Sequence, residues 1–282
     1  MDGIIIINKE KGITSRGVVN ELCKILNTKK IGHTGTLDPF ATGVLVVCIG
    51  KALKLVELLT GCDKTYICKA ILGYETDTLD TEGTIIKENN KKVSSKAIES
   101  IINNFPKTYS QEVPIYSAVK VNGKRLYEYA RNNIKVDLPK RDVNIYNIEL
   151  LETPKEDEFT FTCTVSSGTY IRSLVRDIAY KLDTYGYIKS LERTRVGKFN
   201  IKDSYTLEDV KKGNYKIIPI HEVLDIPKLE VSKELLFKLK NGQIVPKFFE
   251  DDMALIMDSG KEVCIYKTSS KDKTKAEVYK MF

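Results

Sequence analysis

One carboxylate stands in a segment that could hold it rigidly enough for chemistry. Residues 32–39 read Gly-His-Thr-Gly-Thr-Leu-Asp-Pro, so Asp38 follows two glycines and immediately precedes Pro39. Glycine allows backbone angles that other residues disfavour, whereas proline fixes the chain directly after the acid. A carboxylate held in this way can act as a nucleophile, a base or an electrostatic stabiliser. The alternative is that Asp38 only caps a turn, as aspartates in Gly-rich loops often do.

A cation in a helical position is the second candidate. After Ser166-Ser167-Gly168, apolar residues recur at helical spacing, which places Arg172 in the first turn of a helix and off its apolar stripe. A cation there opposes the positive end of the helix dipole, at a cost of roughly 0.3 to 1 kcal/mol unless an anion lies close by. A phosphate or the Asp38 carboxylate could supply that anion. Otherwise Arg172 points into water.

Short apolar segments must position these two residues. Their alternation and bounding turn residues predict strands over residues 4–8, 44–49, 65–72 and 159–165. Helical spacing and capping residues predict helices starting at Thr14 or Ser15, extending over residues 52–59, and starting at Ser94 or Ser95.

Charge favours an anionic partner. The 282-residue chain carries a net charge of +7 and has a pI of about 8.9. Lysines and arginines outnumber acids between residues 115 and 141, and three tyrosines are interleaved with them. Cations neutralise phosphates and tyrosines stack on bases, so this segment predicts a nucleic-acid surface. An ordinary solvated helix and loop is the alternative.

Metal, disulfide and membrane chemistry are not expected. The six cysteines include no Cys-x-x-Cys pair, only two histidines are present, and the acidic loop 76–83 lacks EF-hand spacing. The longest apolar runs, residues 4–7 and 44–49, fall far below the roughly 20 residues of a membrane helix. We therefore expect a cytoplasmic protein with no metal and no membrane partner.

The sequence changes character towards its end. Two prolines, Pro219 and Pro227, precede a stretch of short alternating apolar segments. We predict a boundary after residue 227, with a large domain over residues 1–227 and a small β-rich domain over residues 228–282.

Six stretches, taken together, resemble the TruB family of tRNA pseudouridine synthases, which act on the T-loop uridine. A single Gly-x-Leu-Asp-Pro would be weak support, but these stretches occur in the family's order over roughly the first 200 residues. They are Asn8-Lys9 with Gly12, residues 32–43, Lys64-Thr65-Tyr66, residues 116–120 with 126–131, residues 168–172, and Arg193-Thr194-Arg195.

The resemblance implies a fold and an activity. The implied fold is α+β, with a central mixed, mostly antiparallel sheet flanked by helices and a C-terminal PUA-like RNA-binding domain. The implied activity is isomerisation of uridine 55 in tRNA to pseudouridine, without cofactor or metal, by a monomer that recognises the T-stem-loop. Within residues 1–227, the basic segment 115–141 is expected to contact the RNA.

The resemblance also implies roles for individual residues. Asp38 is the expected catalytic carboxylate, Arg172 its ion-pair partner, and Tyr66 the residue against the target base. His33 is expected to fill the space that the extruded nucleotide leaves, while Tyr170 and Leu191 line the pocket. The expected cationic contacts to substrate are Lys9, Lys120, Lys124 and Arg125. Two other functions stay open from the residues alone: an RNA-binding protein whose turnover is incidental, and a hydrolase with Asp38 as nucleophile.

Overall fold

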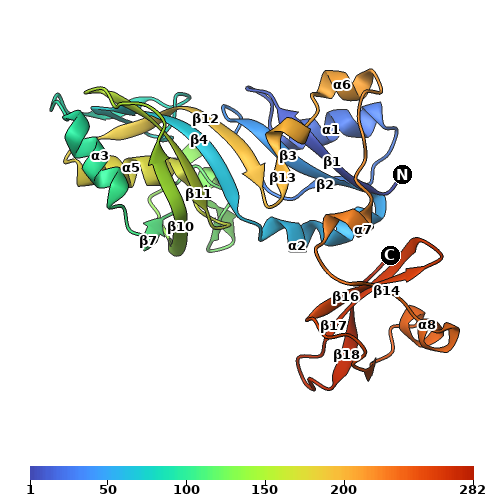
Figure 1. Cartoon of the computed structure of the whole chain (residues 1–282). Coiled ribbons are helices and arrows are strands. Elements are labelled where there is room, and N and C mark those ends of the chain that lie inside the picture. Colours follow the sequence, from blue (N-terminus) through green and yellow to red (C-terminus); the bar gives the residue numbers. More distant parts are fainter.

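A computed structural model describes residues 1–282 and shows a long body with a smaller one below it (Figure 1). The long body is built on a nine-stranded sheet. Its strands are β1 (Gly3–Lys9), β2 (Ile31–His33), β3 (Thr42–Ile49), β4 (Lys64–Leu72), β7 (Thr108–Glu112), β10 (Lys140–Leu150), β11 (Glu158–Val165), β12 (Gly186–Val196) and β13 (Phe199–Asn200).

The sheet has the order β1-β3-β12-β4-β11-β10-β7, with β2 paired to β3 and β13 paired to β12. Only β3 and β12 run parallel, and all other neighbours are antiparallel. The parallel pair brings the strand after the Asp38 turn beside β12: Thr42 pairs with Glu192, which lies 150 residues later in the chain. The expected α+β class with a mixed, mostly antiparallel sheet is confirmed.

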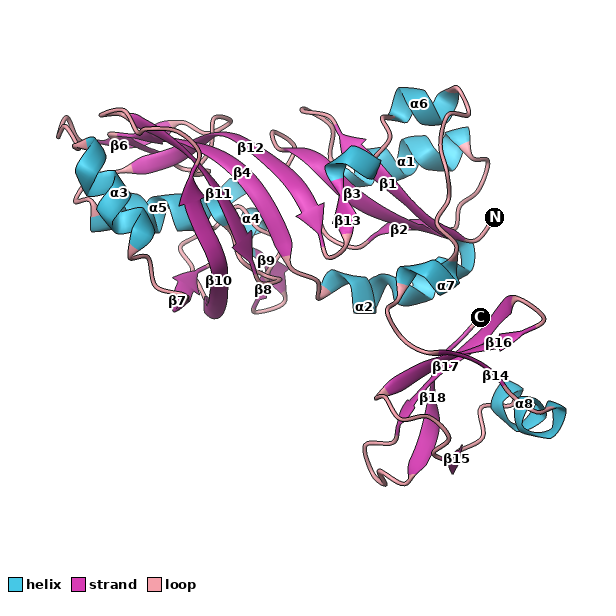
Figure 2. Cartoon of the chain, in the orientation of Figure 1, coloured by secondary structure: helices cyan, strands magenta, loops and turns pink.

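Helices cover the sheet at both ends (Figure 2). They are α1 (Ser15–Ile25), α3 (Ser95–Asn103), α5 (Ile171–Lys181) and α6 (Leu207–Lys211). The Thr14 hydroxyl accepts a hydrogen bond of 2.9 Å from the Gly17 N–H, and Ser94 caps α3 in the same way. Both helices therefore begin where the capping residues predicted. None of the helices combines the length and apolar character needed to cross a membrane.

The prediction of a single helix over residues 52–59 is wrong. The structure has a 3-10 helix, η1 (Gly50–Leu55), followed by the short α2 (Val56–Thr60). Ala52, Leu55 and Leu59 are buried. A separation of three residues aligns side chains in a 3-10 helix and one of four aligns them in an α-helix, so the apolar spacing itself changes where the helix type changes.

The strand predicted over residues 159–165 shows how the core forms. In β11, Phe159, Phe161, Cys163 and Val165 are buried, and the intervening threonines are only partly so. Because alternate side chains of a strand point to opposite faces, this period of two gives the sheet one apolar face. That face packs in one cluster with Leu174 and other residues of α5.

Two small hairpins extend from the long body. One consists of β5 (Tyr74–Thr76) and β6 (Ile85–Glu88), joined by the acidic loop. The other consists of β8 (Lys120–Val121) and β9 (Lys124–Arg125) and leads into α4 (Leu126–Arg131). Asn122 and Gly123 turn it with positive φ angles, as a two-residue hairpin loop requires.

The C-terminal body follows α7 (Ile220–Val223) and contains a five-stranded sheet, which confirms the expected small β-rich domain. Its sheet has the order β14-β16-β17-β18-β15. Leu255 and Ile265 of this sheet belong to the same apolar cluster as Ile4 and Val44 of the long body. The elements are β14 (Lys228–Glu230), α8 (Lys233–Lys240), β15 (Val245–Pro246), β16 (Met253–Asp258), β17 (Lys261–Thr268) and β18 (Lys275–Met281).

Candidate active site

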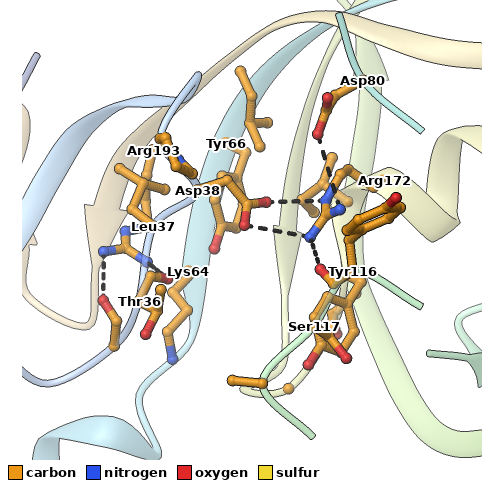
Figure 3. A pocket seen from close by; sticks show the side chains of 18 of the residues that line it. Thr36, Leu37, Asp38, Lys64, Tyr66, Asp80, Tyr116, Ser117, Arg172 and Arg193 are labelled. Carbon is orange, nitrogen blue, oxygen red and sulfur yellow. Dashed lines mark hydrogen bonds and ion pairs between the residues drawn. The ribbon is translucent and has the colours of Figure 1, made fainter. Parts of the chain in front are cut away.

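A cavity of about 690 Å³ lies between the Asp38 turn and the start of α5. Residues 34–39, from the loop between β2 and β3, form one wall, and residues 167–172 form another. Residues 116–118 and the acidic loop contribute further lining. Figure 3 shows the Asp38 and Arg172 side chains pointing toward each other in this cavity.

Arg172 and Asp38 form an ion pair. The Arg172 Nη2 donates to Asp38 Oδ1 at 3.3 Å, and Nε lies 3.0 Å from Oδ2 without the alignment of a hydrogen bond. The Arg172 side chain is only 5% exposed, whereas that of Asp38 is 34% exposed. The guanidinium is thus inside the protein and the carboxylate faces the cavity. The alternative that Arg172 points into water is excluded, and Asp38 is the anion that offsets the helix dipole.

Backbone carbonyls complete the surroundings of Arg172. Its Nη1 donates to the Thr78 carbonyl and its Nη2 to the Tyr116 carbonyl, each at 2.9 Å. A buried guanidinium needs such acceptors, because every unpaired N–H in a site without water costs free energy. The orientation of Arg172 is therefore fixed by three segments of the chain besides its own helix.

A second carboxylate, Asp80 of the acidic loop, also lies close to Arg172, and its spacing in the sequence does not predict this. The Asp80 Oδ2 is 3.9 Å from Arg172 Nη1, and the Asp80 side chain is 5% exposed. Its Oδ1 accepts hydrogen bonds from the Thr78 hydroxyl at 2.7 Å and the Glu82 N–H at 2.9 Å. Burial raises the pKa of Asp80, although these donors and Arg172 oppose the shift. The acidic loop thus supplies a partner for Arg172.

Arg193 fastens the turn that carries Asp38. It is almost fully buried and donates to three backbone carbonyls: Val44 from Nε at 2.8 Å, Gly35 from Nη2 at 3.2 Å and Thr36 from Nη1 at 3.3 Å. One side chain on β12 therefore clamps both the turn and the strand after it. Arg193 lies in one of the six stretches that resemble the family, but the sequence does not predict that it holds the turn.

Ser15 also holds the turn that carries Asp38. Its hydroxyl accepts from the Leu37 N–H at 2.8 Å and donates to the Leu37 carbonyl at 3.0 Å. The residue directly before Asp38 is thereby tied to the first turn of α1. Nothing in the sequence pattern pointed to this contact.

The structure does not bring Lys9 to the cavity. Its side chain is buried, with 1% of the residue exposed, and its Nζ donates to the carbonyls of Glu10, Ile13 and Pro39 at 2.8 to 3.1 Å. Burial lowers the pKa of Lys9 to about 8. All three N–H groups of the ammonium therefore donate to backbone carbonyls, and this geometry contradicts the predicted contact with substrate. Lys9 supports the chain immediately after Asp38 instead.

The predicted aromatic and apolar residues divide into two groups. Tyr66 on β4, Leu191 on β12 and Tyr170 before α5 line the cavity. Burial raises the pKa of Tyr66. His33, at the end of β2, does not line it, although the next residue does. Burial lowers the pKa of His33, and its Nδ1 has no hydrogen-bond partner.

Gln111 holds the start of α5, although no pattern in the sequence points to it. Its Oε1 accepts from the Tyr170 N–H at 2.8 Å and its Nε2 donates to the Tyr170 carbonyl at 3.1 Å. No side chain of the local chain caps α5, whose N-cap is Tyr170. This fully buried glutamine of β7 therefore fixes the backbone two residues before Arg172.

The three predicted basic contacts outside the cavity lie together. Lys120, Lys124 and Arg125 are exposed on the β8–β9 hairpin and do not line the cavity. The helix after the hairpin reaches further, because Tyr127 and Arg131 of α4 do line it. The basic segment thus forms a projecting hairpin joined to one wall of the cavity.

Comparison with known proteins finds relatives that match most of the chain. The model of the TruB family pseudouridylate synthase N-terminal domain matches residues 23–171, and that of the tRNA pseudouridylate synthase B C-terminal domain matches residues 172–225. A tRNA pseudouridine synthase B from Caldanaerobacter subterraneus subsp. tengcongensis is 38% identical over 257 residues, covering 91% of this chain and 90% of that protein. One from Geobacillus kaustophilus is 40% identical over 266 residues, covering 89% and 93%.

A solved structure extends the similarity over the C-terminal sheet. One chain of an H/ACA RNP bound to a substrate RNA containing 2'-deoxyuridine aligns with a TM-score of 0.72 at 26% identity. The alignment covers 99% of this chain and 84% of that chain. Together with the family models, which span most of the long body, these similarities establish the chain as a member of the TruB family of pseudouridine synthases.

Proposed function

We propose that this protein isomerises uridine 55 in the T-loop of tRNA to pseudouridine, with Asp38 as the catalytic carboxylate. The observation that carries the proposal is the Asp38–Arg172 pair, in which the carboxylate faces a cavity and the guanidinium behind it is shielded from water. The relatives named tRNA pseudouridine synthase B support tRNA as the substrate.

The reaction makes limited chemical demands. The bond from the ribose C1′ to N1 of uracil breaks, the base turns while bound, and a bond from C1′ to C5 forms. The proton lost from C5 is balanced by one gained at N1, so nothing is oxidised and no group is added. As the first bond breaks, positive charge develops at C1′. A carboxylate beside the ribose can stabilise that charge or bond to the carbon.

The lining residues suit a base that must turn without leaving. Tyr66 and Leu191 provide an aromatic face and an apolar face on which uracil can slide. Tyr66 is proposed to stack on the uracil, and burial raises the pKa of its hydroxyl. Tyr170 adds to the lining, and neutral His33 is proposed to fill the space that the nucleotide leaves.

Recognition of the T-stem-loop is proposed to involve three regions. Extruding a base costs a few kcal/mol, which contacts elsewhere must offset. The basic segment 115–141, with Lys120, Lys124 and Arg125 exposed on its hairpin, is one source of such contacts. The proposed PUA-like domain, residues 228–282, is the second, and the cavity itself is the third. One chain builds the whole cavity, so we propose a monomer that acts on tRNA in the cytoplasm.

The direct test uses an unmodified tRNA transcript with chelator present and no nucleotide added. We expect one pseudouridine per tRNA, mapped to position 55, and none in a transcript with cytidine there. Tight binding without pseudouridine would favour an RNA-binding protein whose turnover is incidental. Release of free uracil would favour a hydrolase.

Replacing Gln111 with methionine should slow the reaction without weakening tRNA binding. The substitution keeps the size of the side chain but removes both bonds to Tyr170, so the turn that carries Arg172 loosens. Small displacements of a catalytic group cost about 10²-fold in rate, which we expect in single-turnover assays at saturating tRNA. Ser173→Ala is the control, because it deletes one bond from the same helix to the Glu112 carbonyl. Equal rate losses in both variants would contradict a specific role of Gln111.

Removing the charges of the hairpin should weaken binding in a salt-dependent manner. For Lys120, Lys124 and Arg125 replaced by alanine together, we expect the slope of log Kd against log salt to fall by roughly 0.7 to 0.9 for each phosphate that is no longer bound. The rate at saturating tRNA should stay near that of the wild type. A control triple variant at exposed positions near α6 changes the net charge equally: Lys202, Lys211 and Lys216. The same slope change in both would assign the effect to net charge alone.

A further inference from the structure

Five cationic side chains line the cavity. Three of them already donate hydrogen bonds to other groups of the protein. Arg172 is held by Asp38 and two carbonyls, and Arg193 by three carbonyls. The Lys64 Nζ donates to the carbonyls of Thr60 at 3.0 Å and Cys62 at 2.6 Å. These three cations hold the walls together and have few donors left for a ligand.

The other two cations, Arg131 and Arg141, are uncommitted. Neither guanidinium donates a side-chain hydrogen bond or forms an ion pair, and both residues are exposed. Arg131 makes a cation–π contact instead: its guanidinium carbon lies 5.3 Å from the centre of the Tyr127 ring. Glu82, a further carboxylate of the lining, forms no ion pair with either. The guanidinium groups of Arg131 and Arg141 are therefore free to donate hydrogen bonds to a ligand in the cavity.

The two arginines belong to different walls. Arg131 ends α4, whereas Arg141 lies on β10 and is paired in register with Gln111 of the neighbouring strand. The Arg141 Nη1 is 3.8 Å from the point that a Cβ on Gly168 would occupy, so it lies over the turn that leads into α5. Gly168 has a φ of +88° and no side chain to cover that turn. The space beside the guanidinium stays open.

We propose that Arg131 and Arg141 bind the two phosphodiesters that flank the reacting nucleotide, one on each side of its ribose. This inference rests on the proposed function and deepens it by naming the anion-binding residues of the same cavity. A guanidinium presents N–H groups in a planar fork that matches phosphate oxygens. A nucleotide seated over Asp38 carries one phosphate on its 5′ side and one on its 3′ side. Fixing both phosphates would place the ribose at the carboxylate.

The test combines protein variants with RNA in which single phosphates are neutral. Binding of a T-stem-loop RNA is measured in the Asp38→Asn background, so that no turnover occurs. We expect Arg131→Gln and Arg141→Gln each to weaken binding roughly tenfold and to lower the salt slope by about 0.7 to 0.9. A methylphosphonate next to uridine 55 should weaken binding to the parent protein equally. It should have no further effect on the variant that lacks the matching arginine.

Lys140→Gln is the matched control. Lys140 belongs to the basic segment and directly precedes Arg141, but successive side chains of a strand point to opposite faces, and Lys140 lines a separate cavity of about 280 Å³ with Arg176 and Asp177. Of that segment, it is therefore a residue that we place away from the RNA. The variant changes the charge by the same amount one residue away on the strand, and we expect its binding to match the parent. Equal weakening in Lys140→Gln and Arg141→Gln, or methylphosphonate effects that simply add to those of the arginine variants, would overturn the assignment.

The rate separates this inference from the proposed function. With Asp38 intact, Arg141→Gln should lower kcat/KM roughly tenfold, in proportion to its loss of affinity for the RNA. A wild-type protein that makes pseudouridine, while Arg131→Gln and Arg141→Gln bind normally, would refute the phosphate site and leave the function standing. A wild-type protein that makes none would refute the function itself, whatever the binding data show.

Discussion

Asp38→Asn should abolish pseudouridine formation while leaving the complex with tRNA intact. The amide has nearly the same shape, but it carries no charge and cannot bond to or stabilise an electron-poor C1′. We expect the single-turnover rate to fall by about 10⁴-fold or more. The Kd for tRNA should change by no more than a few-fold, because the 34% exposed carboxylate is one group in a large interface. Quenched-flow assays at saturating enzyme would measure the rate, and filter binding the affinity.

Asp225→Asn provides the reference for this experiment. Asp225 is also an aspartate in an ion pair, with Lys198 at 2.8 Å, but its side chain is 87% exposed and outside the cavity. We expect wild-type rates from this variant. Comparable rates in Asp38→Asn and the wild type would remove Asp38 from the chemistry. A collapse of tRNA binding together with the rate would instead assign it to recognition.

Arg172→Met should damage both stability and rate. It leaves Asp80 buried without its cation and the carbonyls of Thr78 and Tyr116 without their donor. Breaking a buried ion pair from one side costs about 3 to 5 kcal/mol. At roughly 2 to 4 °C per kcal/mol for a chain of this size, thermal unfolding should shift down by about 10 °C. The single-turnover rate should fall about 10³-fold, because Asp38 loses the group that orients it.

Arg172→Lys separates charge from geometry. An ammonium restores a positive charge beside Asp80, so much of the stability should return. A single nitrogen cannot reach Asp38 and both carbonyls at once, so the rate should stay low. Recovery of the rate along with the melting temperature would show that charge alone suffices. It would contradict the orienting role of the guanidinium.

Residue patterns predicted the strands and several helix starts because their causes are local. A period of two buries alternate side chains of β11, and a threonine hydroxyl satisfies a free N–H at the start of α1. The position of Arg172 was also informative, since a cation in the first turn of a helix needs an anion and Asp38 provides one. The prediction of one helix over residues 52–59 was wrong because the segment is part 3-10 helix and part α-helix, and the two types differ in the number of residues per turn.

The supports of the site could not be predicted in this way, because they join distant segments through backbone atoms. Arg193 donates to carbonyls about 150 residues earlier, and Gln111 to a carbonyl 59 residues later. A carbonyl is present at every position, so the sequence does not show which one a buried cation will find. The same reason explains Lys9, whose acceptors include the Pro39 carbonyl 30 residues away. The sequence marked these lysines and arginines as charged, but only the fold shows where their charge is used.

The apolar cluster shared by the two bodies affects which lengths of RNA stem could reach the active site. Leu255 and Ile265 of the five-stranded sheet are buried with Ile4 and Val44, so swinging that sheet away would expose them to water. Bodies joined only by a linker reorient freely, whereas the buried apolar contact between these two opposes reorientation. This contact holds the C-terminal sheet at one distance from the Asp38 cavity. If both bodies contact the RNA as proposed, we expect a T-stem of another length to bind without placing its uridine at Asp38.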